Sequence, residues 1–350
     1  NQQTEWSEGM SERLLHTPEG VRDIYGDEYA KKVRVETLLR NKIHGFGYED
    51  IQTPNFEFFD VFSKETGTTP SKELYKFFDK EGNTLVLRPD FTPSIARCAA
   101  KYFMYDEFPL RFCYEGNTFT NNSNLQGKLK EITQMGAELI NDGSVEADAE
   151  IIALVIEALF HTGLTEFQIS VGNVEYFKGI CAEAGIDEET EGKIREYIHM
   201  KNFFGLSEYV SKLPIPEKTK TALASFDSLF GGLEMLERAA SYVTNQASLT
   251  AIDRLKKVYT ALESYGYTDY VGFDLSMLNR YNYYTGIVFR GYTYGTGDAI
   301  VKGGRYNNLM AKFGKDAPSV GFAIYVDDLM NAINRNKIEV AIDYSNILVL

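Results

Sequence analysis

An acid and a hydroxyl stand two residues apart in the segment LRPDFTPSIAR, which covers residues 87–97. If this segment is extended, Asp90 and Thr92 point to the same side of a sheet, because side chains alternate along a strand. A carboxylate beside a hydroxyl on one face can receive the ammonium group of a ligand. The same residue types often begin helices, so either residue can instead cap the helix that follows. Spacing alone favours the capping interpretation.

A second polar set occurs in ITQMGAELI, residues 132–140. Gln134, Gly136 and Glu138 share one face of a strand, since side chains repeat with a period of two. An amide, a bare backbone and a carboxylate are an unusual choice for a core, and Gly136 can leave room for a small ligand on the sheet. A solvated outer face explains the pattern equally well.

Two further segments carry weaker signals. Tyr283 and Tyr284 lie in RYNYYTGIVF and would point to opposite faces of a strand. One ring can then pack in the core while the other offers its hydroxyl to a ligand. Two core aromatics are the commoner explanation. The glycines of KGGRYNNL, residues 302–309, can let a ligand approach the backbone, but the sequence contains no GxGxxG or GxxxxGK[ST] phosphate-binding loop.

The composition predicts a soluble globular protein. The 350 residues are 44% hydrophobic and 25% charged, with no apolar run long enough to span a membrane. The first residues lack the apolar core of a secretory signal. Cys98, Cys113 and Cys181 are far apart and have no histidine at metal-ligand spacing. We therefore expect buried thiols in a reducing cytoplasm and no metal site.

The net charge of −14 argues against nucleic acid as the main ligand. Proteins that bind a phosphate backbone usually carry a basic footprint. A local basic patch remains compatible with the composition, but broad contact with a polyanion is unfavourable.

The elements that must position these residues divide into several regions. Two strand-like runs around an Asn-rich turn predict a hairpin over residues 111–140, and acids early with Gly163 late predict a helix from Val145 to His161. Asp27 can cap a preceding helix that runs to about His44. The α+β class follows, with helices flanking an antiparallel sheet. The predicted regions are a flexible lead-in (1–13), a core (14–173 and 266–335), a helical insertion (174–265) and a C-terminal extension (336–350).

In order and spacing, these segments resemble the histidyl-tRNA synthetase catalytic domain, a class II aminoacyl-tRNA synthetase, over residues 14–333. TPEGVRDIYG is similar to the start of that family and LRPDFTPSIAR to its LRPEGT segment. The hairpin is similar to motif 2, DLSMLNRYNYYTG to the RGLDYYTG segment, and SVGFAIYVDDL to motif 3. The resemblance implies the class II synthetase fold.

The resemblance also implies a pocket for histidine. It assigns six residues to this pocket: Asp90, Thr92, Gln134, Glu138, Tyr283 and Tyr284. Asp90 and Thr92 stand where the family holds the α-amino group, and Gln134 and Glu138 where side chains face the bound amino acid. The tyrosines occupy the positions that close the imidazole pocket. Asp90 replaces the usual glutamate, which shortens the reach by one methylene.

The positions that would hold a nucleotide differ from the family pattern. Thr120 replaces the motif 2 arginine, Asn122 a loop glutamate, Asn279 the arginine of RGLDYY, and Asp328 the motif 3 arginine. A neutral hydroxyl cannot replace a planar, permanently charged guanidinium. The loss of one desolvated charge partner costs on the order of 2–5 kcal/mol. Three lost arginines predict negligible adenylate formation.

A retained amino-acid pocket without nucleotide anchors resembles a second family, the regulatory subunits of short-form ATP phosphoribosyltransferase. This resemblance implies a non-catalytic chain that binds histidine as a regulatory ligand, without a cofactor, and mediates feedback control of the first step of histidine biosynthesis. The implied partners are a separate catalytic subunit in a hetero-oligomer and a second copy bound through the synthetase-like core.

Two alternatives stay open at this point. The chain can be a catalytic fragment of a histidyl-tRNA synthetase, which histidine-dependent ATP–pyrophosphate exchange would reveal. It can also be a non-catalytic tRNA-binding module, which salt-dependent tRNA retention would reveal. In the synthetase an anticodon-binding domain would follow motif 3, and DYSNILVL, residues 343–350, can be the beginning of its first strand.

Overall fold

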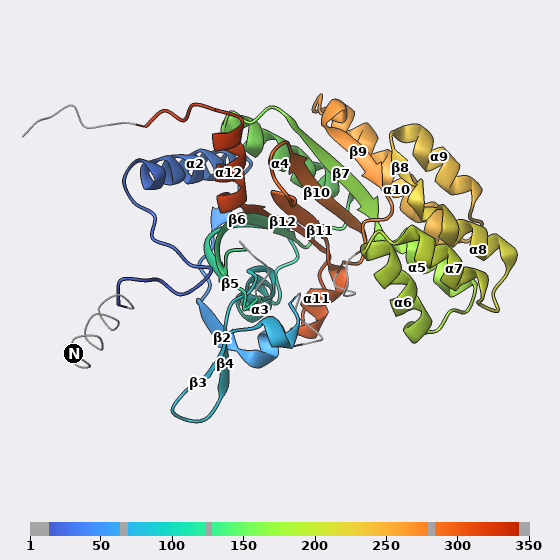
Figure 1. The fold of residues 1–350 in the computed structure, drawn as a ribbon, viewed down its shortest axis with the longest axis horizontal. Coiled ribbons are helices and arrows are strands. Elements are labelled where there is room, and N and C mark those ends of the chain that lie inside the picture. The colour runs from blue at the N-terminus through green and yellow to red at the C-terminus, as the bar shows by residue number, and fades with distance from the viewer. Residues whose placement is uncertain (1–13, 64–68, 123–127, 279–283, 343–350) are drawn as a thin grey trace, which may run out of the picture.

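The structure is a computed structural model that describes residues 14–63, 69–122, 128–278 and 284–342. Its large sheet contains β1 (Glu49–Asp50), β5 (Leu110–Phe119), β6 (Glu131–Ile140), β7 (Phe167–Asn173), β8 (Phe230–Gly231), β9 (Val271–Asp274), β10 (Ile287–Thr293), β11 (Val301–Arg305) and β12 (Ser319–Tyr325). A small sheet contains β2 (Phe56–Phe58), β3 (Lys76–Phe78) and β4 (Thr84–Leu87). The strand orders are β1-β5-β6-β12-β11-β10-β7-β9-β8 and β2-β4-β3 (Figure 1).

The helices flank the large sheet or follow one another beside it. They are α2 (Gly26–Gly45), α3 (Thr92–Tyr102), α4 (Val145–His161), α5 (Val174–Glu183), α6 (Glu188–His199), α7 (Phe203–Ser211), α8 (Glu217–Ala224), α9 (Leu233–Ser241), α10 (Gln246–Glu263), α11 (Asn307–Lys312) and α12 (Val326–Arg335). Short 3₁₀ turns are η1 (Phe59–Phe62), η2 (Ser71–Glu73), η3 (Ser225–Asp227) and η4 (Thr268–Tyr270).

The predicted α+β class is confirmed, and most strand pairs are antiparallel. Two pairs are parallel: β1 with β5, and β7 with β9. The predicted hairpin is β5 and β6, in which Leu110 pairs with Ile140 and Phe119 with Glu131. The helix predicted over residues 145–161 is α4, and the Ser144 hydroxyl caps it by accepting a hydrogen bond from the Ala147 amide at 3.1 Å.

The two faces of the central strands have different partners. On β6, Met135, Ala137 and Leu139 lie in the main apolar core, which also contains the buried face of α4. The opposite face turns toward α3, where Phe91, the N-cap residue of this helix, stacks on Tyr114 of β5 with ring centroids 4.4 Å apart. One face of the sheet is therefore fully packed, and the other leaves space beside α3.

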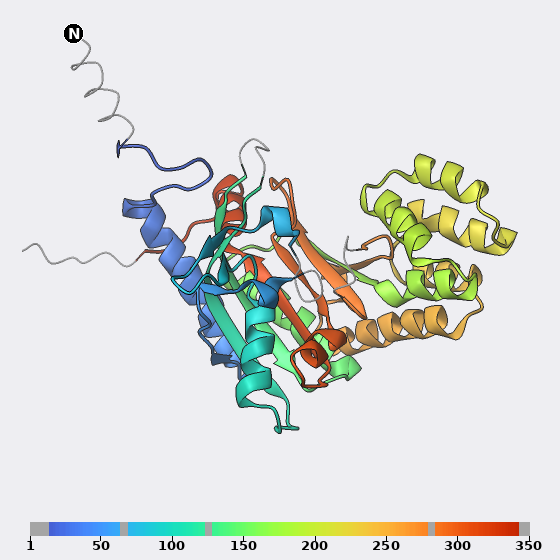
Figure 2. The same cartoon turned by 90° about the horizontal axis from the view of Figure 1, so that it is seen from below.

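A second group of helices, α5–α10, gathers at the far end of the sheet (Figure 2). The predicted helical insertion also contains β8, which pairs with β9 and so extends the large sheet. Helix α10 is tied to α4 by Asp148, a fully buried carboxylate. Its two oxygens accept hydrogen bonds from Arg254 Nε at 2.6 Å and from Arg305 Nε at 2.8 Å.

Two local predictions were wrong. Helix α2 begins at Gly26, with Tyr25 at the N-cap and no side-chain capping bond, so Asp27 lies in the first turn instead of capping it. There its charge is still favourable at the positive end of the helix dipole. Tyr284 is not on a strand, because β10 begins at Ile287.

Among the residues that the structure describes, no helix is both long and apolar enough to cross a membrane.

We expect Asp148→Asn to lower the free energy of unfolding by about 3–5 kcal/mol, because it leaves two arginines beside a neutral amide in a buried site. Denaturant titration of the purified chain measures the change. Asp253→Asn is the matched control, since Asp253 pairs with Lys257 on the exposed surface of α10. It should cost less than about 1 kcal/mol. Equal costs for the two variants would contradict the interpretation of Asp148 as a buried clamp.

Candidate functional site

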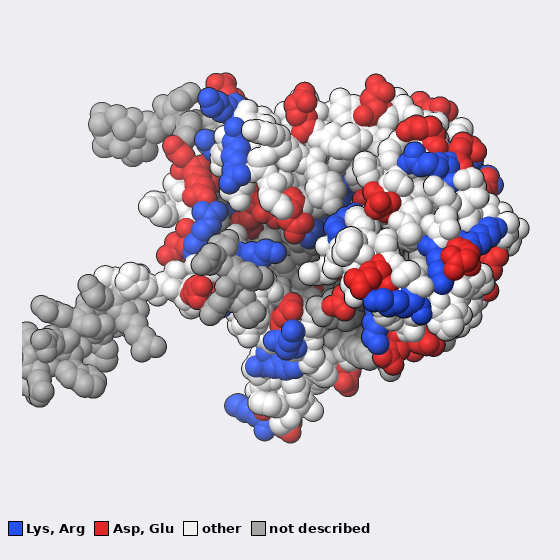
Figure 3. All heavy atoms as spheres, turned by 45° about the vertical axis from the view of Figure 1, so that its right-hand side comes forward, with Lys and Arg blue, Asp and Glu red and all other residues white. Residues whose placement is uncertain are grey.

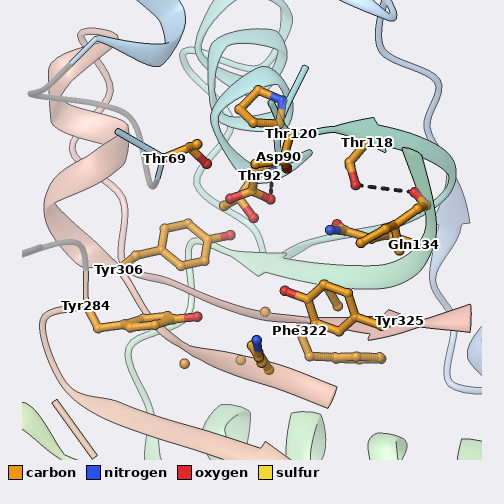
Figure 4. Close-up of a pocket in the computed structure, with 17 residues that line it drawn as sticks. Thr69, Asp90, Thr92, Thr118, Thr120, Gln134, Tyr284, Tyr306, Phe322 and Tyr325 are labelled. Atoms are coloured by element: carbon orange, nitrogen blue, oxygen red, sulfur yellow. Dashed lines mark hydrogen bonds between the residues drawn. The ribbon is translucent and has the colours of Figure 1, made fainter. Parts of the chain in front are cut away.

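A cavity of about 270 Å³ opens on the sheet face beside α3, between β6, β12 and β11. Its chemistry comes mainly from six polar side chains: Asp90, Thr92, Gln134, Tyr284, Lys302 and Tyr306. Figure 4 shows the Tyr284 and Tyr306 hydroxyls entering from one side, Gln134 from the other, and Asp90 and Thr92 from the direction of α3. The walls therefore offer donors and acceptors on several sides of a small space.

Asp90 and Thr92 both line the cavity, as the ligand-binding interpretation predicts. The capping interpretation is also partly realised, because the Thr92 amide donates to Asp90 Oδ1 at 3.3 Å. Thr92 is the first residue of α3 and is not on a strand. A carboxylate at this position can accept hydrogen bonds from a ligand ammonium as well as from the backbone.

Gln134 places its amide in the cavity wall with 5% of the residue exposed. Its side-chain oxygen, Oε1, has no hydrogen-bond partner among the described residues. A buried acceptor without a donor is costly, since it loses its water and gains nothing in return. A ligand N–H group can supply the missing donor.

Glu138 lies one layer below the cavity and does not line it. It is 1% exposed, its Oε1 accepts from Thr92 Oγ1 at 2.7 Å, and its Oε2 accepts from the Tyr306 hydroxyl. Burial is the main cause that raises the pKa of Glu138 to about 8, which the two hydroxyl donors counteract. Glu138 therefore orients two residues of the wall from beneath instead of facing the cavity itself.

Three tyrosines shape the remaining wall. Tyr284, Tyr306 and Tyr325 line the cavity, whereas Tyr283 lies outside the described residues. Burial, and next the nearby Asp90 carboxylate, raise the pKa values of Tyr284 and Tyr325 above the ordinary range. Both phenols therefore stay protonated at neutral pH and can donate hydrogen bonds.

Glycine residues leave space at the floor of the cavity, but Gly136 does not contribute to this space. A Cβ at Gly136 would lie 2.4 Å from the Tyr114 hydroxyl, so this ring already fills the space that we expected for a ligand. The floor is formed instead by backbone at Gly303, Gly304 and Gly321. At Gly321 an added Cβ would lie 1.7 Å from Glu138 Oε2, so glycine is required there for the buried carboxylate.

The positions that differ from the nucleotide-binding pattern of the synthetase family do not all lie at the cavity. Thr120 lines it, while Asn122 does not. Asp328 lies in the first turn of α12, outside the lining, where burial and the neighbouring Asp298 raise its pKa. Asn279 lies outside the described residues.

Sequence reasoning missed two functional candidates, Tyr306 and Lys302. Both belong to KGGRYNNL, in which the sequence pattern indicates only the glycines as positions where a ligand can approach the backbone. Lys302 lines the cavity beside Gly303, and its Nζ lies 3.2 Å from Asp298 Oδ2. On the face shown in Figure 3, lysines and arginines are interspersed with acids and form no continuous basic stripe.

The fold brings one metal-like set together elsewhere: His44, Asp50 and Cys113, whose ligand atoms lie within 4.8 Å of one another. Sequence spacing did not indicate this proximity. Arg40 NH1 lies 3.7 Å from Asp50 Oδ1, and burial raises the pKa of the Cys113 thiol to about 12. A neighbouring guanidinium and a protonated thiol both oppose a divalent cation, so we interpret the set as an ion-pair cluster.

Comparisons with known proteins agree with this architecture. The family model of histidyl-tRNA synthetase matches residues 20–329. A relative from Acetivibrio thermocellus, named ATP phosphoribosyltransferase regulatory subunit, is 43% identical over 94% of this chain and 79% of its own length. The structure is similar to that of an ATP phosphoribosyltransferase regulatory subunit/histidyl-tRNA synthetase from Bacillus halodurans, with a TM-score of 0.86, 36% identity, and coverage of 92% and 84% of the two chains. Histidyl-tRNA synthetase from Nostoc, at 20% identity and a TM-score of 0.78 over 93% of this chain and 77% of its own, shares the fold.

We expect Glu138→Gln to flatten the pH dependence of stability between about pH 5 and 8. The folded-state pKa of about 8 lies above the ordinary value of 4.5, so the folded protein holds a proton that the unfolded chain releases. Rising pH across this window therefore lowers the free energy of unfolding, on the order of 1.4 kcal/mol per pH unit between the two pKa values. Glutamine resembles the protonated acid and removes this dependence.

Denaturant titrations at several pH values measure the slope. Glu208→Gln is the control, because the hydrogen bond from Lys212 lowers the pKa of this exposed acid and it stays charged in both states over the window. An unchanged slope in Glu138→Gln would show that the buried carboxyl is ionised in the folded protein.

Proposed function

The chain belongs to the family of ATP phosphoribosyltransferase regulatory subunits, and on this premise we propose that it binds histidine in the sheet cavity and carries feedback inhibition to a separate catalytic chain. The observation that supports the ligand most directly is the buried, unpartnered Oε1 of Gln134, which lies in one cavity with the Asp90 carboxylate. Both accept hydrogen bonds, and histidine supplies N–H donors at its ammonium and its ring.

The same cavity is poorly suited to activating an amino acid with ATP. Thr120 stands where the synthetase pattern has an arginine, and a hydroxyl offers no charge for a phosphate. Lys302 supplies a cation, but as a single point charge already paired with Asp298. Adenylate formation needs several fixed cations where charge develops in the transition state. We therefore propose binding without chemistry, in agreement with the regulatory role after which the relatives are named.

Regulation requires that histidine bind two states of the protein with different affinity. The cavity offers a physical origin for such a difference. Thr92 and Tyr306 line it and also hold Glu138, so a ligand that engages either hydroxyl acts on a fully buried carboxyl. Tyr306 follows Arg305, which binds Asp148 and, through it, the helices around α10. We propose that this connected set transmits the presence of histidine.

Two assemblies complete the proposal. One joins this chain to the catalytic subunit in a hetero-oligomer. The other joins two copies through the synthetase-like core, where exposed aromatics such as Phe58 and Phe78 of the small sheet favour association. A cytoplasmic location stays a prediction.

We expect calorimetry to record saturable heat for histidine and none for ATP. With the catalytic chain added, histidine should inhibit phosphoribosyl transfer only when the present chain is included. Histidine-dependent ATP–pyrophosphate exchange by the purified chain would favour the synthetase alternative. Retention of tRNA that weakens with salt would favour the tRNA-binding alternative, which the net charge of −14 opposes.

We expect Gln134→Met to stabilise the ligand-free protein while weakening histidine binding about tenfold or more. Methionine removes the unpartnered acceptor, whose burial costs about 1–3 kcal/mol, and cannot accept the ligand hydrogen bond. Thermal denaturation and calorimetry measure the two effects. The control is Gln168→Met at an exposed position of β7, which should change neither quantity greatly. A variant that is destabilised and still binds histidine normally would remove Gln134 from the proposed site.

A further inference from the structure

We propose that Lys302 binds the carboxylate of the ligand, so that the cavity selects zwitterionic α-amino acids over amines with the same side chain. This inference rests on the proposed function, because it concerns the same cavity. It adds a residue that sequence reasoning did not assign, and it defines the ligand by two charges of opposite sign.

The charges of the cavity wall carry the inference. Among the described lining residues only Asp90 and Lys302 are charged, one negative and one positive. Tyr325 lies close to both: the Asp90 carboxylate contributes to its raised pKa, and Lys302 Nζ lies 5.0 Å from its ring centroid. The two charges therefore occupy one small space. An α-amino acid carries its ammonium and carboxylate on the same carbon, which suits a wall with both complements.

Strand register explains how Lys302 comes to the cavity. Lys302 of β11 pairs with Ala323 of β12, and Ala323 pairs with Gly136 of β6, the strand that also supplies Gln134. Alternation then places Lys302 and Gln134 on one face. Two neighbours of Lys302 on this face, Ala323 and Gly304, are small. On the other side Arg290 of β10 pairs directly with Lys302, and the Tyr325 ring centroid lies 5.0 Å from the ammonium.

The present partner of Lys302 can be exchanged for a ligand. Asp298 is 53% exposed and lies 3.2 Å from the ammonium, and Lys302 itself is 35% exposed. Ion pairs of this exposure contribute little to stability, since water screens them. A ligand carboxylate inside the cavity is less solvated and interacts more strongly. The flexible lysine stem lets the ammonium turn from one carboxylate to the other.

The experiment compares two ligands that differ only at the carboxylate. L-histidine and histidinol share the ring and the ammonium, but histidinol carries a hydroxymethyl group instead of the carboxylate. We expect the unaltered chain to bind histidine about tenfold or more tightly than histidinol, as a charge-assisted hydrogen bond would give. Lys302→Met should bind the two ligands within about threefold of each other, with histidinol affinity nearly unchanged. Calorimetry measures all four constants.

Three variants test the assignment further. Lys302→Arg should retain the preference for histidine because it keeps the charge. Asp298→Asn should increase histidine affinity and leave histidinol unaffected, since it removes the competing carboxylate. Lys256→Met is the matched control: Lys256 is also 35% exposed and ion-paired, to Glu237, but lies in α10 away from the cavity lining. It should change neither affinity.

The outcomes separate the inference from the function on which it rests. If Lys302→Met keeps the full preference for histidine, or if the unaltered chain binds both ligands equally, the inference is overturned while histidine binding stands. If the unaltered chain binds neither ligand, the proposed function is overturned together with the inference. A Lys302→Met chain that fails to fold leaves the Asp298→Asn comparison, in which unchanged histidine affinity would reject a role for the ammonium.

Discussion

The buried carboxyl of Glu138 is the constraint around which this face of the sheet is organised. A carboxyl with 1% exposure is tolerated only when hydrogen bonds replace its water. Thr92 at the start of α3 and Tyr306 after β11 provide these bonds, and Gly321 of β12 provides the space. Three segments far apart in the chain are thereby fixed relative to β6. The cavity is the space that remains between them.

A second buried carboxylate extends this organisation to the helical part of the chain. Asp148 of α4 holds Arg305, the residue before Tyr306, and Arg254 of α10. The Arg305–Tyr306 pair thus belongs to two buried polar networks at once. Because Arg305 and Tyr306 are adjacent in the chain, a displacement in one network shifts the other. The proposed transmission from the cavity to the helical insertion runs through this pair.

Under the proposed function, a synthetase fold binds an amino acid without activating it. Affinity for an amino acid needs groups that match its ground state, and Asp90 and Gln134 are of this kind. Catalysis needs groups that bind the transition state more strongly, which for adenylate formation means cations around a pentacoordinate phosphorus. Thr120, which stands where the synthetase pattern has an arginine, offers no such charge. Under the proposed function, the loss of these cations removes the chemistry and leaves the cavity for regulation.

The sequence by itself determined the local elements and much of the polar wall. The alternation of side chains predicted β6 and its polar face, and the residues at the helix ends predicted the bounds of α4. The fold was predicted from the order of the segments that resemble the synthetase family. Local periodicity states which face a side chain takes, but it does not state what fills the space opposite. Only the tertiary structure showed that Tyr114 occupies the space at Gly136, that Glu138 lies beneath the wall, and that Tyr284 precedes its strand.

The placement of Lys302 and Tyr306 beside Gln134 was likewise decided by the tertiary structure. These residues are more than 150 positions apart, and the strand order β6-β12-β11 makes them neighbours. That order depends on the packing of whole strands between α3 and the main core, and no short stretch of sequence encodes it. The same reason explains why Asp90 could be recognised from its segment while its oppositely charged counterpart in the cavity could not.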